Sequence, residues 1–245
     1  MLSESETDHG LLSQSELTAP QNSPIVYGLG TLGLTSTAQA FSGYYLFFYV
    51  DVLGLAVTLA AIINVIYAIW DAVNDPLVGY LSDNTRTRWG RRRPWLLVGL
   101  PFCLVFLVLI YAVPGAFRRG NALFWYALVM VFLFETASTV MNTNYEALFP
   151  ELFQTFRERT RASDYNHGLG MIGELIGFSL TPIVYSKFGF VGMAVFFAIG
   201  TGILLIISIL RNSEDPNAQK HPPLNLKDAL REVLRDRPFW QFTVV

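Results

Sequence analysis

Long apolar stretches separated by short polar breaks dominate the sequence from residue 25 to residue 211. Because the hydrocarbon core of a bilayer is about 30 Å thick, a helix needs about 20 mostly apolar residues to cross it. The stretches that reach this length, in each of which we predict a membrane helix, are 25–50, 56–81, 94–114, 122–148, 165–186 and 190–210. The expected fold class is therefore an all-α integral membrane protein, with a six-helix transmembrane bundle over residues 25–211.

The segments outside this bundle have a different composition. Residues 1–24 are rich in Ser and acidic residues and contain no Lys or Arg, which predicts a disordered acidic tail and not a cleaved signal peptide. Residues 212–237 are predicted to form a linker with an amphipathic helix, because apolar residues recur there at helical spacing among charges. Residues 238–245 have the composition of an incomplete seventh helix, so we interpret the chain as the first half of something longer.

The positions of the basic residues predict the orientation. Of the 17 Lys and Arg residues, all but Arg118, Arg119 and Lys187 fall in alternate loops or after the sixth segment. Short cytoplasmic loops carry the excess of Lys and Arg in membrane proteins. We therefore expect both termini to be cytoplasmic, in a multi-pass protein of the plasma or inner membrane.

Composition excludes several classes of function. The chain is 52% hydrophobic and 15% charged with a net charge of -2, so it offers no basic surface for nucleic acid. The single cysteine, Cys103, excludes an intrachain disulfide, and with three scattered histidines it makes a Cys or His metal site improbable. The nucleotide-binding, zinc-protease and serine-hydrolase motifs are missing from the sequence, so we expect no enzyme and no cofactor.

Two acids lie within the second apolar segment. Asp71 and Asp75 are one helical turn apart, and Asn74 lies beside them. Carboxylates inside a membrane span are costly and usually face a partner, a cavity or an ion. Their oxygens suit Na+, and closely spaced carboxylates can also share a proton. The alternative is that both acids pair with the Arg-rich loop that follows this helix.

The fourth and fifth segments also carry polar groups. A stripe at helical spacing runs along the fourth segment, which predicts an aqueous cavity or a polar seam between helices. Interhelical hydrogen bonds explain Ser138 and Thr139 in that stripe, but they account poorly for its acids. Glu174 in the fifth segment shares the side of the glycines and is either a functional acid or a hydrogen-bonding residue inside the bundle. The stripe residues are Glu135, Ser138, Thr139, Asn142, Tyr145 and Glu146.

The loop after the second segment resembles the signature of the major facilitator superfamily between its second and third helices. The matching residues run from Gly79 through Asp83, Arg88, Gly90, Arg91 and Arg92 to Pro94. The resemblance implies a gating role for this loop. Gly79 would let the helix approach an opposing half, and Asp83 would pair with Arg88, Arg91 or Arg92 when the cytoplasmic side is closed.

A wider set of motifs resembles the glycoside-pentoside-hexuronide:cation symporter family, typified by the melibiose permease. The motifs lie at 27–30, 48–55, 70–76, 88–95, 146–152 and 157–161. That family has twelve helices in two halves, so the resemblance implies the N-terminal half. The expected partners are a lipid bilayer, a sugar-like substrate, and either a C-terminal six-helix half or a second copy.

The resemblance also implies the binding residues. The cation site would consist of Asp71, Asn74, Asp75 and Thr139, and the coupling cation would be Na+ or H+, with no other metal. The family's sugar-binding acids and arginine fall on Thr35, Asn142 and near Asn166, which differ here and bring galactoside specificity into question. The further substrate candidates are Tyr145, Glu146 and Glu174.

The expected function is therefore cation-coupled symport of a sugar, glycoside or uronide by alternating access. Three other hypotheses stay open at this point. The first is a lysolipid carrier of a related branch, and the second is a half-length product that does not transport. The third, an intramembrane enzyme with an Asp71–Asp75 dyad, is disfavoured because acids four residues apart on one helix are about 6 Å apart at Cβ.

Overall fold

The computed structural model describes residues 22–118 and 120–212, whose regular elements are all helical. The expected acidic tail up to residue 21, the linker with its amphipathic helix and the start of a seventh helix lie outside the described residues. The elements are α2 (Pro24–Phe47), the π-helix η1 (Phe48–Val52), α3 (Val57–Asp83), α4 (Arg93–Tyr111), the 3-10 helix η2 (Gly115–Phe117), α5 (Gly120–Leu152) and α6 (Phe156–Arg211).

Four of these helices, α3 to α6, are long and apolar enough to cross a membrane. They make the described chain an integral membrane protein, as expected. The helix α2 covers most of the predicted first segment but is less apolar, because glycines and hydroxyl residues occupy much of its sequence. Its polarity is explained by its neighbours, since both arms of α6 pack against it.

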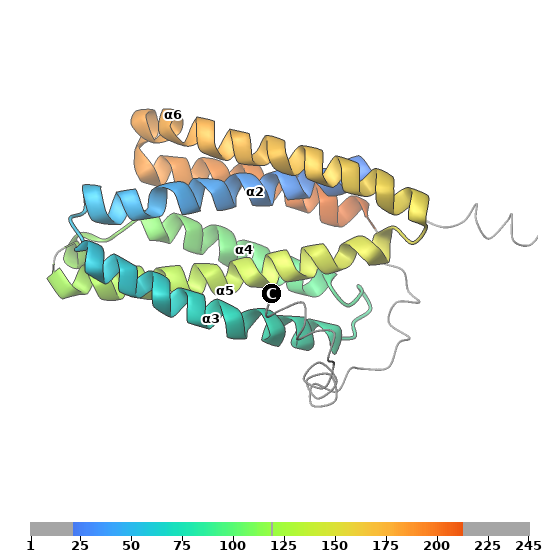
Figure 1. The fold of residues 1–245 in the computed structure, drawn as a ribbon, viewed down its shortest axis with the longest axis horizontal. Coiled ribbons are helices and arrows are strands. Elements are labelled where there is room, and N and C mark those ends of the chain that lie inside the picture. The colour runs from blue at the N-terminus through green and yellow to red at the C-terminus, as the bar shows by residue number, and fades with distance from the viewer. Residues whose placement is uncertain (1–21, 119, 213–245) are drawn as a thin grey trace, which may run out of the picture.

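The number of separate helices differs from the expected six. Five long helices are present among the described residues, because the fifth and sixth predicted segments both lie within α6. Gly189 interrupts that helix with a φ of 73° and a ψ of 173°, a conformation that glycine adopts without steric cost. The chain reverses there with almost no loop (Figure 1). We call residues 156–188 the first arm of α6 and residues 190–211 the second arm.

The helix α2 packs against both arms. Toward the first arm, the backbone of Leu32 lies so close to Gly173 that a Cβ there would be 2.6 Å from the Leu32 carbonyl oxygen. Toward the second arm, the hydroxyl groups of Thr37 and Thr201 are 2.6 Å apart, and Thr201 also donates a hydrogen bond to the Gly33 carbonyl. Small residues at such contacts let helix backbones approach closely, which is a common way to associate helices in a membrane.

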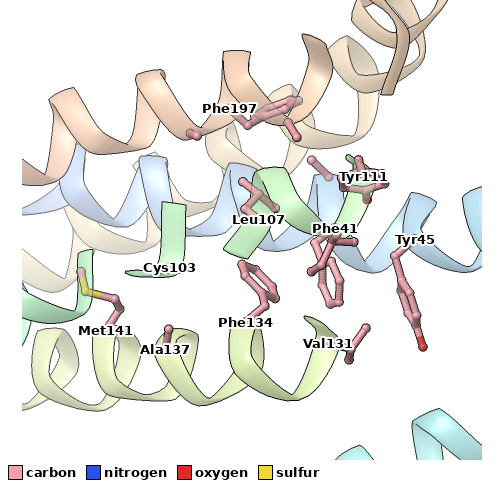
Figure 2. Close-up of a cluster of buried hydrophobic side chains, with 14 of the residues drawn as sticks. Phe41, Tyr45, Cys103, Leu107, Tyr111, Val131, Phe134, Ala137, Met141 and Phe197 are labelled. Atoms are coloured by element: carbon pink, nitrogen blue, oxygen red, sulfur yellow. The ribbon is translucent and has the colours of Figure 1, made fainter. Parts of the chain in front are cut away.

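The hydrophobic core lies between α2, α4, α5 and the second arm (Figure 2). Phe41, Leu107, Phe134 and Phe197 meet there, and each is buried. The helix α3 lies at the edge of the bundle beside α5 (Figure 1). Its outer surface exposes apolar side chains such as Ile69, a composition suited to lipid or to another membrane segment.

Candidate functional site

Two polar contacts hold α3 against α5. The indole nitrogen of Trp70 donates a hydrogen bond of 3.0 Å to the Thr136 hydroxyl, and the Trp70 ring lies 4.5 Å from that of Phe132. One turn further along, the Thr139 hydroxyl donates to an Asp71 carboxylate oxygen at 3.5 Å. The register of the two helices therefore brings together two of the four residues predicted for the cation site.

The other two predicted cation ligands lie on the next turn of α3. Asn74 is buried at 2% exposure, and its amide nitrogen has no hydrogen-bond partner among the described residues. Asp75 is exposed, and it lies within electrostatic range of Asp71. Carboxylate, amide and hydroxyl oxygens are the ligands that a hard cation prefers, so the chemistry of this set fits Na+. An unsatisfied buried amide is costly unless something else contacts it, and a bound ion with its water would do so.

A cavity of about 400 Å³ lies between α2, α4, α5 and both arms of α6, and it extends to α3. Three of the predicted substrate residues line it: Thr35, Asn142 and Glu174. The Thr35 hydroxyl donates to the Thr31 and Gly170 carbonyls at 2.9 and 3.1 Å, whereas the Asn142 amide donates to the Ser138 hydroxyl at 3.3 Å.

The remaining predicted substrate residues are not among those that line the cavity. The ring of Tyr145 stacks on that of Tyr27 with 4.6 Å between centroids, and its hydroxyl is hydrogen-bonded to Ser208 at 2.7 Å. Asn166 accepts a hydrogen bond from the Thr31 hydroxyl, and Glu146 is exposed near the end of α5. In this conformation, Tyr145 and Asn166 hold α2 to its neighbours.

Several polar residues that line the cavity were not among the predicted site residues. Glu135 was recognised in the polar stripe but not assigned to a site, and Asn64 is a single amide in an otherwise apolar turn of α3. A polar residue within a membrane span often marks a functional position, and both Asn64 and Glu135 carry that signal in the sequence. The unassigned polar lining residues are Thr37, Gln39, Ser42, Tyr45, Asn64, Tyr67, Glu135, Ser138 and Thr201.

Four charged residues form an ion-pair network where α3 and α5 end and α4 begins. Asp83 pairs with Arg92, and its carboxylate is 3.8 Å from the Arg91 guanidinium. Arg91 in turn pairs with Glu151 at 2.6 Å, and Arg92 lies 3.6 Å from the same carboxylate. The structure therefore brings together three of the five predicted gating residues and adds Glu151, which sequence reasoning did not assign.

The other two predicted gating residues lie outside this network. Arg88 is exposed and stacks over the Trp89 ring at 5.3 Å. At Gly79, a Cβ would meet nothing closer than the Thr143 methyl group at 4.0 Å, so no described residue requires a glycine there.

Comparison with known proteins finds a family model, described as MFS/sugar transport protein, that matches residues 26–245. An uncharacterized symporter of Synechocystis sp. is 39% identical over 165 residues, which are 65% of this chain and 30% of that protein. Sodium-dependent lysophosphatidylcholine symporter 1 of Xenopus tropicalis is 32% identical over 63% of this chain and 29% of its own length. The isoprimeverose transporter of Lactiplantibacillus pentosus is 26% identical over 90% of this chain and 48% of its own length. The chain therefore spans less than half the length of each of these relatives.

Proposed function

Since the chain belongs to the MFS/sugar transport protein family, as the N-terminal half of a melibiose-permease-like symporter, we propose that it takes part in cation-coupled symport of a sugar or glycoside. The observation that carries this proposal is the position of two sites along α5. Glu135 lines the cavity, and Thr139, one turn later, contacts Asp71 on α3. A solute in the cavity and a cation at Asp71 would therefore share one helix as a wall.

This arrangement provides a physical basis for coupling. Glu135 lies one turn before Thr139, which contacts Asp71, so a cation at Asp71 would reduce the repulsion between the two carboxylates. Binding of the cation would then favour binding of the solute, and the reverse holds by linkage. Both Na+ and H+ would act in this way, and the oxygen ligands around Asp71 suit Na+.

Alternating access also needs a second set of helices opposite the cavity and a defined orientation of the protein in the membrane. In our proposal the two arms of α6 are the fifth and sixth membrane helices, and a second six-helix half, or a second copy of this chain, faces the cavity. The length of the relatives and the exposed apolar surface of α3 support that arrangement. By the distribution of positive charge, the Arg-rich end of the bundle and both termini would be cytoplasmic.

Gradient-driven uptake tests the proposed function. Vesicles that contain the protein, expressed from its complete gene, are prepared without substrate inside and are given an inward gradient of either Na+ or H+. We expect one of the two gradients to drive accumulation of a labelled glycoside above its external concentration, and an ionophore that dissipates it to abolish the effect. Saturable uptake of lysophosphatidylcholine with none of any glycoside would contradict the sugar assignment and favour the lysolipid alternative, which the named relative supports.

Asp83→Asn is expected to open the Arg-rich end of the bundle. The substitution removes the carboxylate that contacts both Arg91 and Arg92, and a partly exposed ion pair contributes about 1 kcal/mol, equivalent to about a fivefold change in the equilibrium. The measurement is the labelling rate, from the cytoplasmic side, of a cysteine introduced at Ser138 in the cavity, with buried Cys103 replaced by Ala.

Arg88→Gln provides the comparison for this prediction, because it removes a charge from the same loop but lies outside the ion-pair network. Its labelling rate should stay close to that of the parent protein. Equal labelling of Asp83→Asn and the parent would mean that the arginines set the topology of the chain and do not gate it.

A further inference from the structure

The described cavity wall carries acidic residues and no basic ones. Among the described residues that line the cavity, Glu135 and Glu174 are acidic and none is Lys, Arg or His. Glu135 comes from the middle of α5, and its carboxylate makes no hydrogen bond or ion pair within the described part of the chain. A carboxylate placed at a cavity inside a membrane bundle is costly unless a ligand or ion uses it.

Aromatic rings and amides line the same cavity as this carboxylate. The ring of Phe41 lies 4.8 Å from that of Tyr45 and 4.6 Å from that of Phe134, the residue before Glu135. The Tyr45 oxygen points out of the aromatic cluster (Figure 2), and its hydroxyl donates to the Asn64 side-chain oxygen across the gap between α2 and α3. This leaves the Tyr45 oxygen as an acceptor and the Asn64 amide nitrogen as a donor beside the cavity.

Glu135 is close to these groups. It lines the same cavity as Tyr45 and Tyr67. The cavity therefore combines a charged acceptor, an amide donor and apolar ring faces. A sugar matches this combination, because its hydroxyl groups both donate and accept while its C–H faces pack on aromatic rings.

Because this wall has acidic residues and no basic ones, we infer that the cavity selects an uncharged polyhydroxylated solute and rejects hexuronides. Glu135 is the residue that sets this selectivity. The inference rests on the proposed function and narrows its substrate class. Glu135 accepts hydrogen bonds from sugar hydroxyls, whereas the carboxylate of a uronide would meet a wall whose described ionisable residues include Glu135 and Glu174 and no basic residue to pair with.

The test compares neutral sugars with their uronides in the protein expressed from its complete gene. The probes are methyl glucoside and methyl galactoside, each set against the methyl uronide that carries a carboxylate in place of the hydroxymethyl group. Binding is measured by calorimetry in detergent at saturating Na+. The unmodified protein should bind at least one neutral glycoside at least about tenfold more tightly than its uronide, the size of one lost charged hydrogen bond.

Glu135→Gln keeps the size of the side chain and removes its charge. We expect this variant to lose about tenfold in affinity for the neutral glycoside, to bind the uronide no less tightly than the parent, and so to lose the selectivity. Glu135→Asp should restore part of it. Asp164→Asn is the matched control, since it removes one carboxylate from an exposed position of α6 outside the cavity and should leave both affinities unchanged.

The outcomes separate the inference from the proposed function. Equal binding of the uronide and the neutral glycoside by the unmodified protein would overturn the selectivity and leave sugar symport standing. Unchanged selectivity in Glu135→Gln would remove Glu135 from its role. A protein that binds no member of the panel would contradict the proposed sugar function itself, and the inference with it.

Discussion

Replacing Asp71 with asparagine is expected to abolish accumulation of solute against a gradient while leaving the protein folded in the membrane. Asp71 is the carboxylate that Thr139 contacts across α3 and α5, next to the buried amide of Asn74. An asparagine keeps the shape and the hydrogen bond but carries no charge, so a cation loses its main electrostatic partner. Asp75→Asn should act in the same direction, because its charge adds to the field at Asp71.

Two assays together identify this effect as a loss of coupling. In Asp71→Asn vesicles, the Na+-driven accumulation ratio should fall to one, whereas exchange of labelled for unlabelled solute at equal ion concentration should persist. Asp51→Asn is the matched control, since Asp51 is an exposed acid of η1 and lies outside the predicted cation site. Ion-dependent accumulation at the parent level in both Asp71→Asn and Asp75→Asn would contradict the assignment of the cation site.

Replacing Gly173 with alanine is expected to destabilise the bundle strongly. A Cβ at this position would lie 2.6 Å from the Leu32 carbonyl oxygen and 3.1 Å from the Leu32 Cα, and it would also meet the Thr35 hydroxyl. Backbone atoms of α2 cannot rotate away as a side chain would, so the two helices must separate. Overpacking of this kind typically costs about 1–3 kcal/mol, which should lower the thermal unfolding midpoint in detergent by several degrees.

Gly170→Ala is a matched control on the same helix. Its Cβ would lie 3.5 Å from the Thr31 methyl group and 3.9 Å from the Thr35 methyl group, which are ordinary contacts. Since alanine also favours the helix, this variant should unfold at or above the midpoint of the parent. Equal midpoints for Gly173→Ala and Gly170→Ala would show that α2 does not approach the first arm of α6 as closely as described.

The helical fold could be predicted from the apolar stretches, and so could the ends of α3 and α4 to within a few residues, but the start of α6 could not. The predicted start at residue 165 is wrong for α6, which begins at Phe156 because Thr155 and Glu158 form a capping box. The charged residues of that first turn had suggested a loop. The reversal at Gly189 was expected as a break, yet it is so short that the two arms are continuous apart from that one residue.

The sequence predicts which polar residues are candidates for the site, but it does not predict how they are arranged in space. The polar stripe of α5 was recognised from helical spacing, which treats its members as one surface. Residues ten positions apart, such as Glu135 and Tyr145, differ by about 80° around a helix of 3.6 residues per turn. That difference places Glu135 at the cavity and turns Tyr145 toward Tyr27 and Ser208. The register of α3 against α5, which joins Asp71 to Thr139, likewise depends on tertiary packing that no single helix encodes.

The packing of α2 between the two arms of α6 sets the order of events during biosynthesis. Thr31 lies 135 residues before its partner Asn166. At a translation rate of about 5–20 residues per second, the ribosome needs roughly ten seconds to deliver that partner. The hairpin of α4 and α5 involves neighbours in the sequence and can form earlier, whereas α2 enters the bilayer with its hydroxyl groups and glycines uncovered. Of the described helices, the first to be synthesised is thus among the last to be fully packed, because its partners lie in α6.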